Sequence, residues 1–366
     1  MMNDVTRLVA LALSLFVTPV IAQAPDRSID ALMAPYARLD GPGASVLVIR
    51  DARVTYMKGY GLADVENRVP VTPRSNFRLA SLSKQFTATA IMLLVADARL
   101  RYDDAITTLL PGLPLLASGV TVRHVLNHTS GLPDYEDFVP DSQTVQVHDR
   151  DIPALIAHAS APKFPAGARF SYSNTGYGLL ALIVERASGQ RFADFLHDRI
   201  FAPLGMTGTV AHEEGRSVVA ERAFGYSVTS AGVRRTDQSN TSAVLGDGGV
   251  YSSAADLAKW DRALEQYSLV SAEAQQLAWT PPALAGGHPT EYGFGWFIDR
   301  DHGTMRLRHH GESRGFTNCI LRYPEKRLTV VILTNRSGGA PWDVAQRIAE
   351  LYLDPSTGGP SAPWHP

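Results

Sequence analysis

Segments with the pattern of β-strands lie near the two ends of this 366-residue chain. Two of them, 44–50 and 54–61, surround a short turn, and three more, 305–309, 316–323 and 327–335, follow late in the sequence. The connections within each group are short, which favours antiparallel neighbours. We therefore predict one antiparallel sheet of about five strands that is built from both ends of the chain.

Helical patterns and loops fill the long middle of the chain, residues 77–289. Segment 81–98 is apolar on nearly all sides, which predicts a helix buried at the centre of the protein. The first and last predicted helices are expected to cover the sheet. The sequence thus predicts an α+β fold, in which 27–76 and 290–353 form a sheet part and 77–289 form a mostly helical inserted part.

The first 22 residues have the layout of a secretory signal peptide. Arg7 precedes an apolar run over 8–17, and small residues follow near the expected cleavage site. This run is short for a membrane span. We expect export to a bacterial periplasm, with no stable membrane insertion after cleavage. At the other end, 354–366 is rich in proline and glycine and is predicted to be disordered.

Composition excludes several classes of protein. Lys and Arg number 34 against 36 Asp and Glu, so the chain lacks the basic surplus of a nucleic-acid-binding protein. Cys319 is the single cysteine, which rules out an intramolecular disulfide and a cysteine-rich metal site. His124 and His128 are four residues apart, but Val125 occupies the glutamate position of the H-E-x-x-H motif. We therefore expect no metal, no cofactor and a small-molecule substrate.

Ser81 and Lys84 are three residues apart at the start of the predicted central helix. Positions i and i+3 share one face of a helix, so the hydroxyl and the amine would lie one turn apart. Burial lowers the pKa of a lysine, and a neutral amine can take the proton of the serine. The pattern predicts Ser81 as a nucleophile that becomes acylated. A second match, Ser160 and Lys163, lies among prolines and is interpreted as accidental.

A polar, turn-forming segment with Tyr172 and Asn174 precedes an apolar helix pattern. A tyrosine near a cationic lysine can lose its proton well below its usual pKa near 10, and could then serve as a base for the serine and an acid for the leaving group. Asn174 has both donors and an acceptor, which suits it to hold a lysine and a substrate amide. The alternative is a structural turn with an ordinary helix-capping asparagine.

A third polar segment, HHGESRG, begins at His309 and lies between two predicted strands. Gly311 would allow the strand edge to approach a ligand closely. The N–H of Glu312 is predicted to form an oxyanion hole with the N–H of Ser81. The segment also matches G-x-S-x-G, which would make Ser313 the nucleophile of an α/β-hydrolase. That motif needs a helix after it, whereas a strand pattern follows here.

These three pairs of residues, in this order, resemble the motifs of the serine β-lactamase and penicillin-binding protein superfamily. The likeness is stronger to the class C-type branch, which includes family VIII esterases, D-aminopeptidases and DD-peptidases. It extends from about Gly43 to Asn335 and is carried by TPRSNFRLASLSKQFTATAI, TVRHVLNHTSGLPDY, FSYSNTGYG, GDGGVYSSAADLAKW, YGFGW and HHGESRGF. It implies a β-lactamase/transpeptidase-like fold. By resemblance, Ser81 is the acylated nucleophile, and Lys84 and Tyr172 transfer protons. The substrate-binding residues implied are Asn174, His309 and Gly311.

One departure separates the chain from true class C β-lactamases, which carry K-T-G where this chain has His309-His310-Gly311. A lysine there is a permanent cation for the substrate carboxylate, whereas a histidine is mostly neutral at pH 7. We predict a serine hydrolase of small esters or amides, including D-amino-acid and peptidoglycan-type peptides. The alternatives are a class C-like β-lactamase or DD-carboxypeptidase, a penicillin-binding sensor without turnover, and an α/β-hydrolase that uses Ser313. The sequence leaves open whether Lys84 or Tyr172 accepts the serine proton.

Overall fold

The computed structural model describes residues 25–140 and 142–353. The predicted signal peptide over 1–22 and the predicted tail over 354–366 lie outside these residues, so both stay predictions. Within the described residues, no helix combines the length and the apolar character that crossing a membrane requires.

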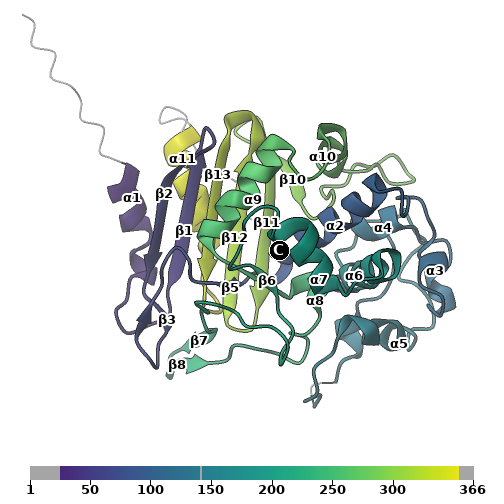
Figure 1. Ribbon diagram of the computed structural model, residues 1–366, viewed down its shortest axis with the longest axis horizontal. Coiled ribbons are helices and arrows are strands. Elements are labelled where there is room, and N and C mark those ends of the chain that lie inside the picture. The colour runs from purple at the N-terminus through teal and green to yellow at the C-terminus, as the bar shows by residue number, and fades with distance from the viewer. Residues whose placement is uncertain (1–24, 141, 354–366) are drawn as a thin grey trace, which may run out of the picture.

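A six-stranded antiparallel sheet forms the centre of the fold (Figure 1). Its strands, in spatial order, are β10 (Phe297–Asp301), β11 (Thr304–Ser313), β12 (Phe316–Tyr323), β13 (Leu328–Thr334), β1 (Ala44–Arg50) and β2 (Arg53–Tyr60). β1 lies between β13 and β2, and Ala44 pairs with Thr334. The prediction of one antiparallel sheet built from both chain ends is confirmed.

The edge strand β10 is the strand that the sequence pattern did not predict. Charged residues fill three of its five positions. Asp299 forms ion pairs with Arg306 and Arg308 of the neighbouring strand β11, at 2.8 and 2.6 Å. The segment lacks the β-branched, apolar character on which strand prediction depends. Ionic contacts help to hold this edge strand in place.

Helices cover both faces of the sheet (Figure 1). They are α1 (Pro25–Leu32) and α11 (Pro341–Leu353) on one face and α9 (Ala254–Gln266) on the other. Side chains alternate along β1: Val46 and Val48 pack with α1 and α11, whereas Leu47 and Ile49 join the larger core on the α9 side. α9 belongs by sequence to the predicted helical part but packs on the sheet. The predicted domain boundaries stay a prediction.

The helical part lies beside the β10 and β11 end of the sheet (Figure 1). It contains α2 (Lys84–Ala96), α3 (Ile106–Leu109), α4 (Val122–Leu126), α5 (Ile152–Ile156), α6 (Asn174–Ser188), α7 (Phe192–Leu196), α8 (Leu245–Gly248) and α10 (Ala272–Ala278). α2 is buried along nearly its whole length, as its apolar sequence predicts. A tight 3-10 turn, η2 (Ala80–Ser83), leads into it, so Ser81 lies just before the α-helix and Lys84 is its first residue.

Further short sheets lie outside the six-stranded sheet. They are β3 (Leu62–Asp64) with β4 (Val69–Pro70), β5 (Phe77–Arg78) with β9 (Val250–Ser252) and β6 (Val210–Ala211), and β7 (Tyr226–Thr229) with β8 (Gly232–Arg235).

One buried side chain, Asn335, ties the chain ends together. Its Oδ1 accepts the N–H of Gly43 at 2.7 Å, across a sequence separation of 292 residues. Its Nδ2 donates to the carbonyl oxygens of Leu62 and Phe224, at 3.0 and 2.9 Å. Both functions of one amide therefore satisfy buried backbone groups from three distant segments.

Candidate active site

The amine of Lys84 is the centre of the site. Lys84 is fully buried, and its Nζ lies 2.9 Å from Ser81 Oγ, 2.8 Å from Asn174 Oδ1 and 2.9 Å from the carbonyl oxygen of Asp247. Three elements far apart in sequence thus converge on one nitrogen. The serine and lysine lie on one side of the η2–α2 junction, as their spacing predicts.

The chemistry of these three contacts orients the amine toward Ser81. The oxygens of Asn174 and Asp247 can only accept hydrogen bonds. When Lys84 is neutral, its two N–H bonds satisfy these oxygens, and its lone pair remains for the hydroxyl proton of Ser81. The arrangement can therefore activate the serine by direct proton transfer to Lys84.

Burial lowers the pKa of Lys84 to about 8, while the nearby carboxylate of Asp247 opposes this shift. Because the neutral amine is the base, the acylation rate is expected to rise with pH and to level off above about pH 8. Below this value the rate is expected to fall about tenfold per pH unit, as the ammonium form takes over. Stopped-flow acylation of Ser81 by a neutral fluorophosphonate between pH 5 and 10 measures this limb; a rate that falls as pH rises would contradict it.

Tyr172 lies beside the amine, and its ring centroid is 5.0 Å from Lys84 Nζ. The ring of His128 packs against it at a tilt of 35°, with centroids 4.2 Å apart, which restricts its orientation. Part of the Tyr172 side chain is open to solvent, but its hydroxyl oxygen is buried. Burial raises the pKa of Tyr172 above its usual value, and the carboxylates of Asp247 and Asp134 act in the same direction.

This result differs from the sequence expectation that a neighbouring cation would deprotonate Tyr172. The cation is opposed by burial and by several carboxylates, which sequence spacing does not reveal. The directions of the two pKa shifts favour Lys84 over Tyr172 as the base for acylation. A neutral phenol beside the nucleophile suits a proton donor for the leaving group.

Asn174 is the first residue of α6, and its side chain does not cap that helix. Its Oδ1 accepts from Lys84, and its Nδ2 donates to Glu136 Oε2 at 3.3 Å. Its backbone N–H donates to Asp134 Oδ2 at 2.7 Å. The side chain of Asn174 therefore does not act as an ordinary helix cap.

Strand β11 brings the third predicted segment to η2. A Cβ on Gly311 would lie 2.1 Å from the carbonyl oxygen of Leu79, so only glycine allows β11 this close to the turn that carries Ser81. The close approach seen here is to backbone, and an approach of Gly311 to a ligand stays a prediction. Ser81 and Glu312 line the same pocket, which is the juxtaposition that an oxyanion hole requires.

His309 lies behind Tyr172 and is fully buried, outside the set of residues that line the pocket. Its Nδ1 donates to the carbonyl oxygen of His310 at 2.6 Å, so its Nε2 accepts from the Tyr292 hydroxyl at 3.0 Å. Burial lowers the pKa of His309 well below its usual value, which keeps the ring neutral. A direct substrate contact for His309 stays a prediction.

The pocket that opens above Ser81 has a volume of about 180 Å³. Sequence reasoning missed several of the residues that line it, namely Arg78, Glu136, Ser239, Thr241 and Ser242. Asp247 comes from the G-D-G-G segment, whose glycines were the available signal for a turn near the site. The others come from loops and short elements without a distinctive pattern.

A buried carboxylate holds the α8 turn that carries Asp247. Asp149 accepts the backbone N–H groups of Leu245 and Gly246, both at 2.9 Å, one on each oxygen. These are the first two N–H groups of α8, which have no partner inside the helix. This clamp fixes the position of the Asp247 carbonyl oxygen that Lys84 contacts.

The competing sequence motifs do not assemble in this way. Ser313 ends β11 and a second strand begins at Phe316, so the strand-to-helix turn of an α/β-hydrolase is absent at this motif. Lys163 is exposed and paired with Asp137 at 3.3 Å. Nowhere in 25–140 or 142–353 do three or more His, Cys, Asp or Glu residues form a cluster that could hold a metal ion.

Comparisons with known proteins identify the family. The family model described as Beta-lactamase matches residues 26–353. Penicillin-binding protein 4* of Bacillus subtilis (strain 168) is 34% identical over 340 residues, which cover 84% of this chain and 74% of that protein. A D-aminopeptidase of Gluconobacter oxydans (strain 621H) is 29% identical over 87% of this chain, which spans 60% of the length of that relative.

Solved structures show the same fold. The octameric penicillin-binding protein homologue from Pyrococcus abyssi has a TM-score of 0.77 and 31% identity, and the match covers 90% of this chain and 76% of that one. The D-amino acid amidase from Ochrobactrum anthropi SV3, complexed with L-phenylalanine amide, has a TM-score of 0.75 and 26% identity, with 89% and 99% covered. The chain therefore belongs to the Beta-lactamase family of serine hydrolases.

Proposed function

We propose that this protein hydrolyses short amides, esters or peptides of amino acids through an acyl-enzyme on Ser81. The observation that carries the proposal is the position of Lys84, whose lone pair can face only the Ser81 hydroxyl once its two N–H bonds satisfy Asn174 and Asp247. The relatives with D-aminopeptidase and D-amino acid amidase names support this class of substrate.

The reaction follows from this geometry. Lys84 takes the proton of Ser81 as the oxygen forms a bond to the substrate carbonyl carbon. The N–H groups of Ser81 and Glu312 bind the oxyanion of the tetrahedral intermediate. The proton then reaches the leaving nitrogen or oxygen, with Tyr172 as the nearby donor, and the bond to the leaving group breaks. Water attacks the resulting ester, and Ser81 regains its proton when the acid product leaves.

Trapping the intermediate tests this proposal. The enzyme, mixed with excess D-alanine p-nitrophenyl ester and quenched within milliseconds, should gain the mass of one alanyl group on the peptide that contains Ser81. A burst of nitrophenolate equal to the enzyme concentration should accompany it. Turnover without a covalent adduct, or an adduct on another residue, would refute the acyl-enzyme on Ser81.

Two exposed carboxylates at the pocket, of Glu136 and Glu312, favour substrates with a free ammonium group. The carboxyl group of Asp247 also lines the pocket, but burial raises its pKa to about 8. Asp247 is buried and bonded to the Tyr135 hydroxyl at 2.9 Å, whereas Glu136 is exposed at the mouth. Of the two exposed carboxylates, Glu136 also accepts a hydrogen bond from Nδ2 of Asn174, whose Oδ1 contacts Lys84, so we assign the contact with an incoming ammonium to Glu136.

We expect D-alanine p-nitroanilide to be hydrolysed with a kcat/KM at least about tenfold above that of its N-acetyl derivative, because acetylation removes the charge. Glu136→Gln should reduce this preference to less than about threefold. Asp137→Asn is the matched control: it removes the same charge from the neighbouring position, but Asp137 pairs with Lys163 and does not line the pocket. Equal losses in both variants would show a long-range charge effect instead of a contact.

A further inference from the structure

The active-site pocket is lined by a buried arginine, Arg78 of β5, that has no counter-charge. Arg78 is only 4% exposed. Its Nη2 donates to the carbonyl oxygen of Ser242 at 2.8 Å, and its Nε is buried without a partner. Among the described residues, no carboxylate oxygen lies within 4.0 Å of the guanidinium. An unpaired charge at such depth is unfavourable unless a ligand completes it.

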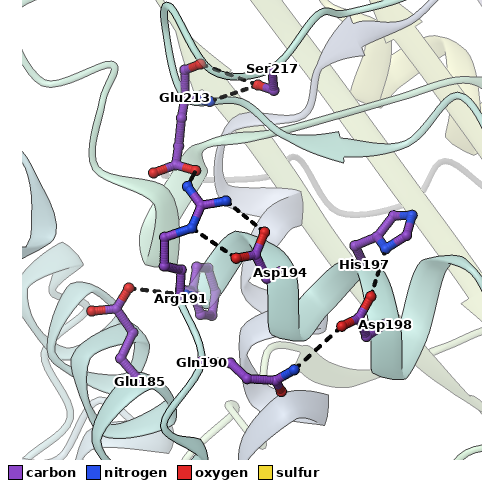
Figure 2. Close-up of polar contacts among 9 residues, drawn as sticks. Glu185, Gln190, Arg191, Asp194, His197, Asp198, Glu213 and Ser217 are labelled. Carbon is purple, nitrogen blue, oxygen red and sulfur yellow. Dashed lines mark hydrogen bonds and ion pairs between the residues drawn. The ribbon is translucent and has the colours of Figure 1, made fainter.

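Two other arginines of the protein have the carboxylate partner that Arg78 lacks. Figure 2 shows Arg191 held between Asp194 and Glu213, each with a closest contact of 2.6 Å. Arg222, which packs on the same Tyr251 ring as Arg78, pairs with Asp237 at 2.6 Å. These two are more exposed than Arg78 and still have carboxylate partners. Arg78 is more buried than either and lines the pocket without such a partner.

The third polar segment does not supply a cation here. His309 takes the place of the K-T-G lysine of class C β-lactamases, and its side chain is turned into the aromatic cluster around Tyr292. The amine of Lys84 already contacts Ser81, Asn174 and Asp247. Among the described residues that line the pocket, Arg78 is the cationic side chain. We propose that Arg78 binds a carboxylate group of the substrate.

This inference rests on the proposed function and narrows its substrate class. Arg78 and the carboxylate of Glu136 line one pocket of about 180 Å³, so a ligand that satisfies both has opposite charges a short distance apart. A dipeptide with free ends has this character. The structure thus favours short zwitterionic peptides over amides and esters that lack a carboxylate.

Binding in the absence of turnover tests the proposal. In the Ser81→Ala background, calorimetric titration compares D-alanyl-D-alanine with D-alanyl-D-alaninamide, which differ only in the carboxylate. We expect the free acid to bind about 10- to 100-fold more tightly, the range typical of a charge-assisted hydrogen bond. Adding Arg78→Gln should bring the ratio of the two dissociation constants close to one.

Two further variants separate contact from structure. Arg78→Lys keeps the charge and should keep part of the preference, although it loses the planar guanidinium. Arg222→Gln is the control, since it removes a guanidinium from the same ring outside the pocket and should retain the full ratio. Circular dichroism shows whether each variant folds. If Arg78→Gln does not fold, the comparison of ligands in the Ser81→Ala background and in Arg78→Lys still decides the question.

Equal affinities for the acid and the amide in the Ser81→Ala background would overturn the proposal, as would no measurable binding of either. A ratio that survives Arg78→Gln would also overturn it. Persistent hydrolysis by Ser81→Ala, in contrast, would contradict the proposed acyl-enzyme on Ser81. The ratio of the two dissociation constants would still test the role of Arg78 independently.

Discussion

Ser81→Ala is expected to lower kcat for D-alanine p-nitroanilide by about four to six orders of magnitude. The loss is this large because the serine oxygen is the atom that bonds to the substrate, and within the described part of the chain no other hydroxyl forms a hydrogen bond with the Lys84 amine. KM should change little, since the walls of the pocket remain. Removal of one surface-accessible hydroxyl should also leave the midpoint of thermal unfolding within a few degrees of its original value.

Ser313→Ala is the matched control for this prediction. Ser313 lines the same pocket and belongs to the G-x-S-x-G match, yet it lies in a strand–turn–strand segment. We expect its variant to keep activity within about tenfold of the original and to be labelled by a fluorophosphonate on Ser81. Loss of labelling in Ser313→Ala, with labelling intact in Ser81→Ala, would reverse the assignment of the nucleophile.

Lys84→Met is expected to lower the rate of Ser81 acylation by about two to four orders of magnitude, because it removes the base while keeping the length of the side chain. The substitution replaces a buried amine by an apolar group. It leaves two carbonyl oxygens, of Asn174 and Asp247, without a donor, which costs stability, but it also removes the cost of burying a charge. The rise of the acylation rate with pH, which levels off above about pH 8 in the original protein, should also disappear.

Lys163→Met tests whether the other Ser-x-x-Lys match contributes. Lys163 is exposed and forms a surface ion pair, which is worth little. Acylation and its pH dependence should be unchanged in this variant. If the acylation rate of Lys84→Met still rose with pH and levelled off near pH 8, another group, such as Tyr172, would have to be the base.

Local sequence patterns predicted those parts of the fold that depend on local burial. The strands predicted over 44–50 and 316–323 match the structure to the residue. The apolar character of 81–98 correctly placed Lys84 in the interior and so predicted the direction of its pKa shift. Strand β10 was not predicted, because ion pairs with a neighbouring strand help to hold it and such contacts leave no periodic pattern in the sequence.

The pocket could be predicted only in part, because its electrostatics arise from residues far apart in the chain. Lys84 and the Asp247 carbonyl oxygen are separated by 163 positions, and no spacing rule relates them. The same holds for the carboxylates that, after burial, help to raise the pKa of Tyr172. The missing counter-charge of Arg78 is likewise a property of the assembled site and cannot be read from the segment FRLASLSK.

The pairing of β1 with β13 has a consequence for the way the molecule is made. The edge of β1 that will meet β13 stays uncovered while nearly three hundred further residues are synthesised, since Asn335 and Gly43 are 292 positions apart. Closing so long a loop is entropically costly, and contacts of this range slow folding. A nascent chain is therefore expected to expose an unpaired, aggregation-prone β-strand until its last strand emerges. Holdase chaperones that mask such edges should raise the yield of native protein.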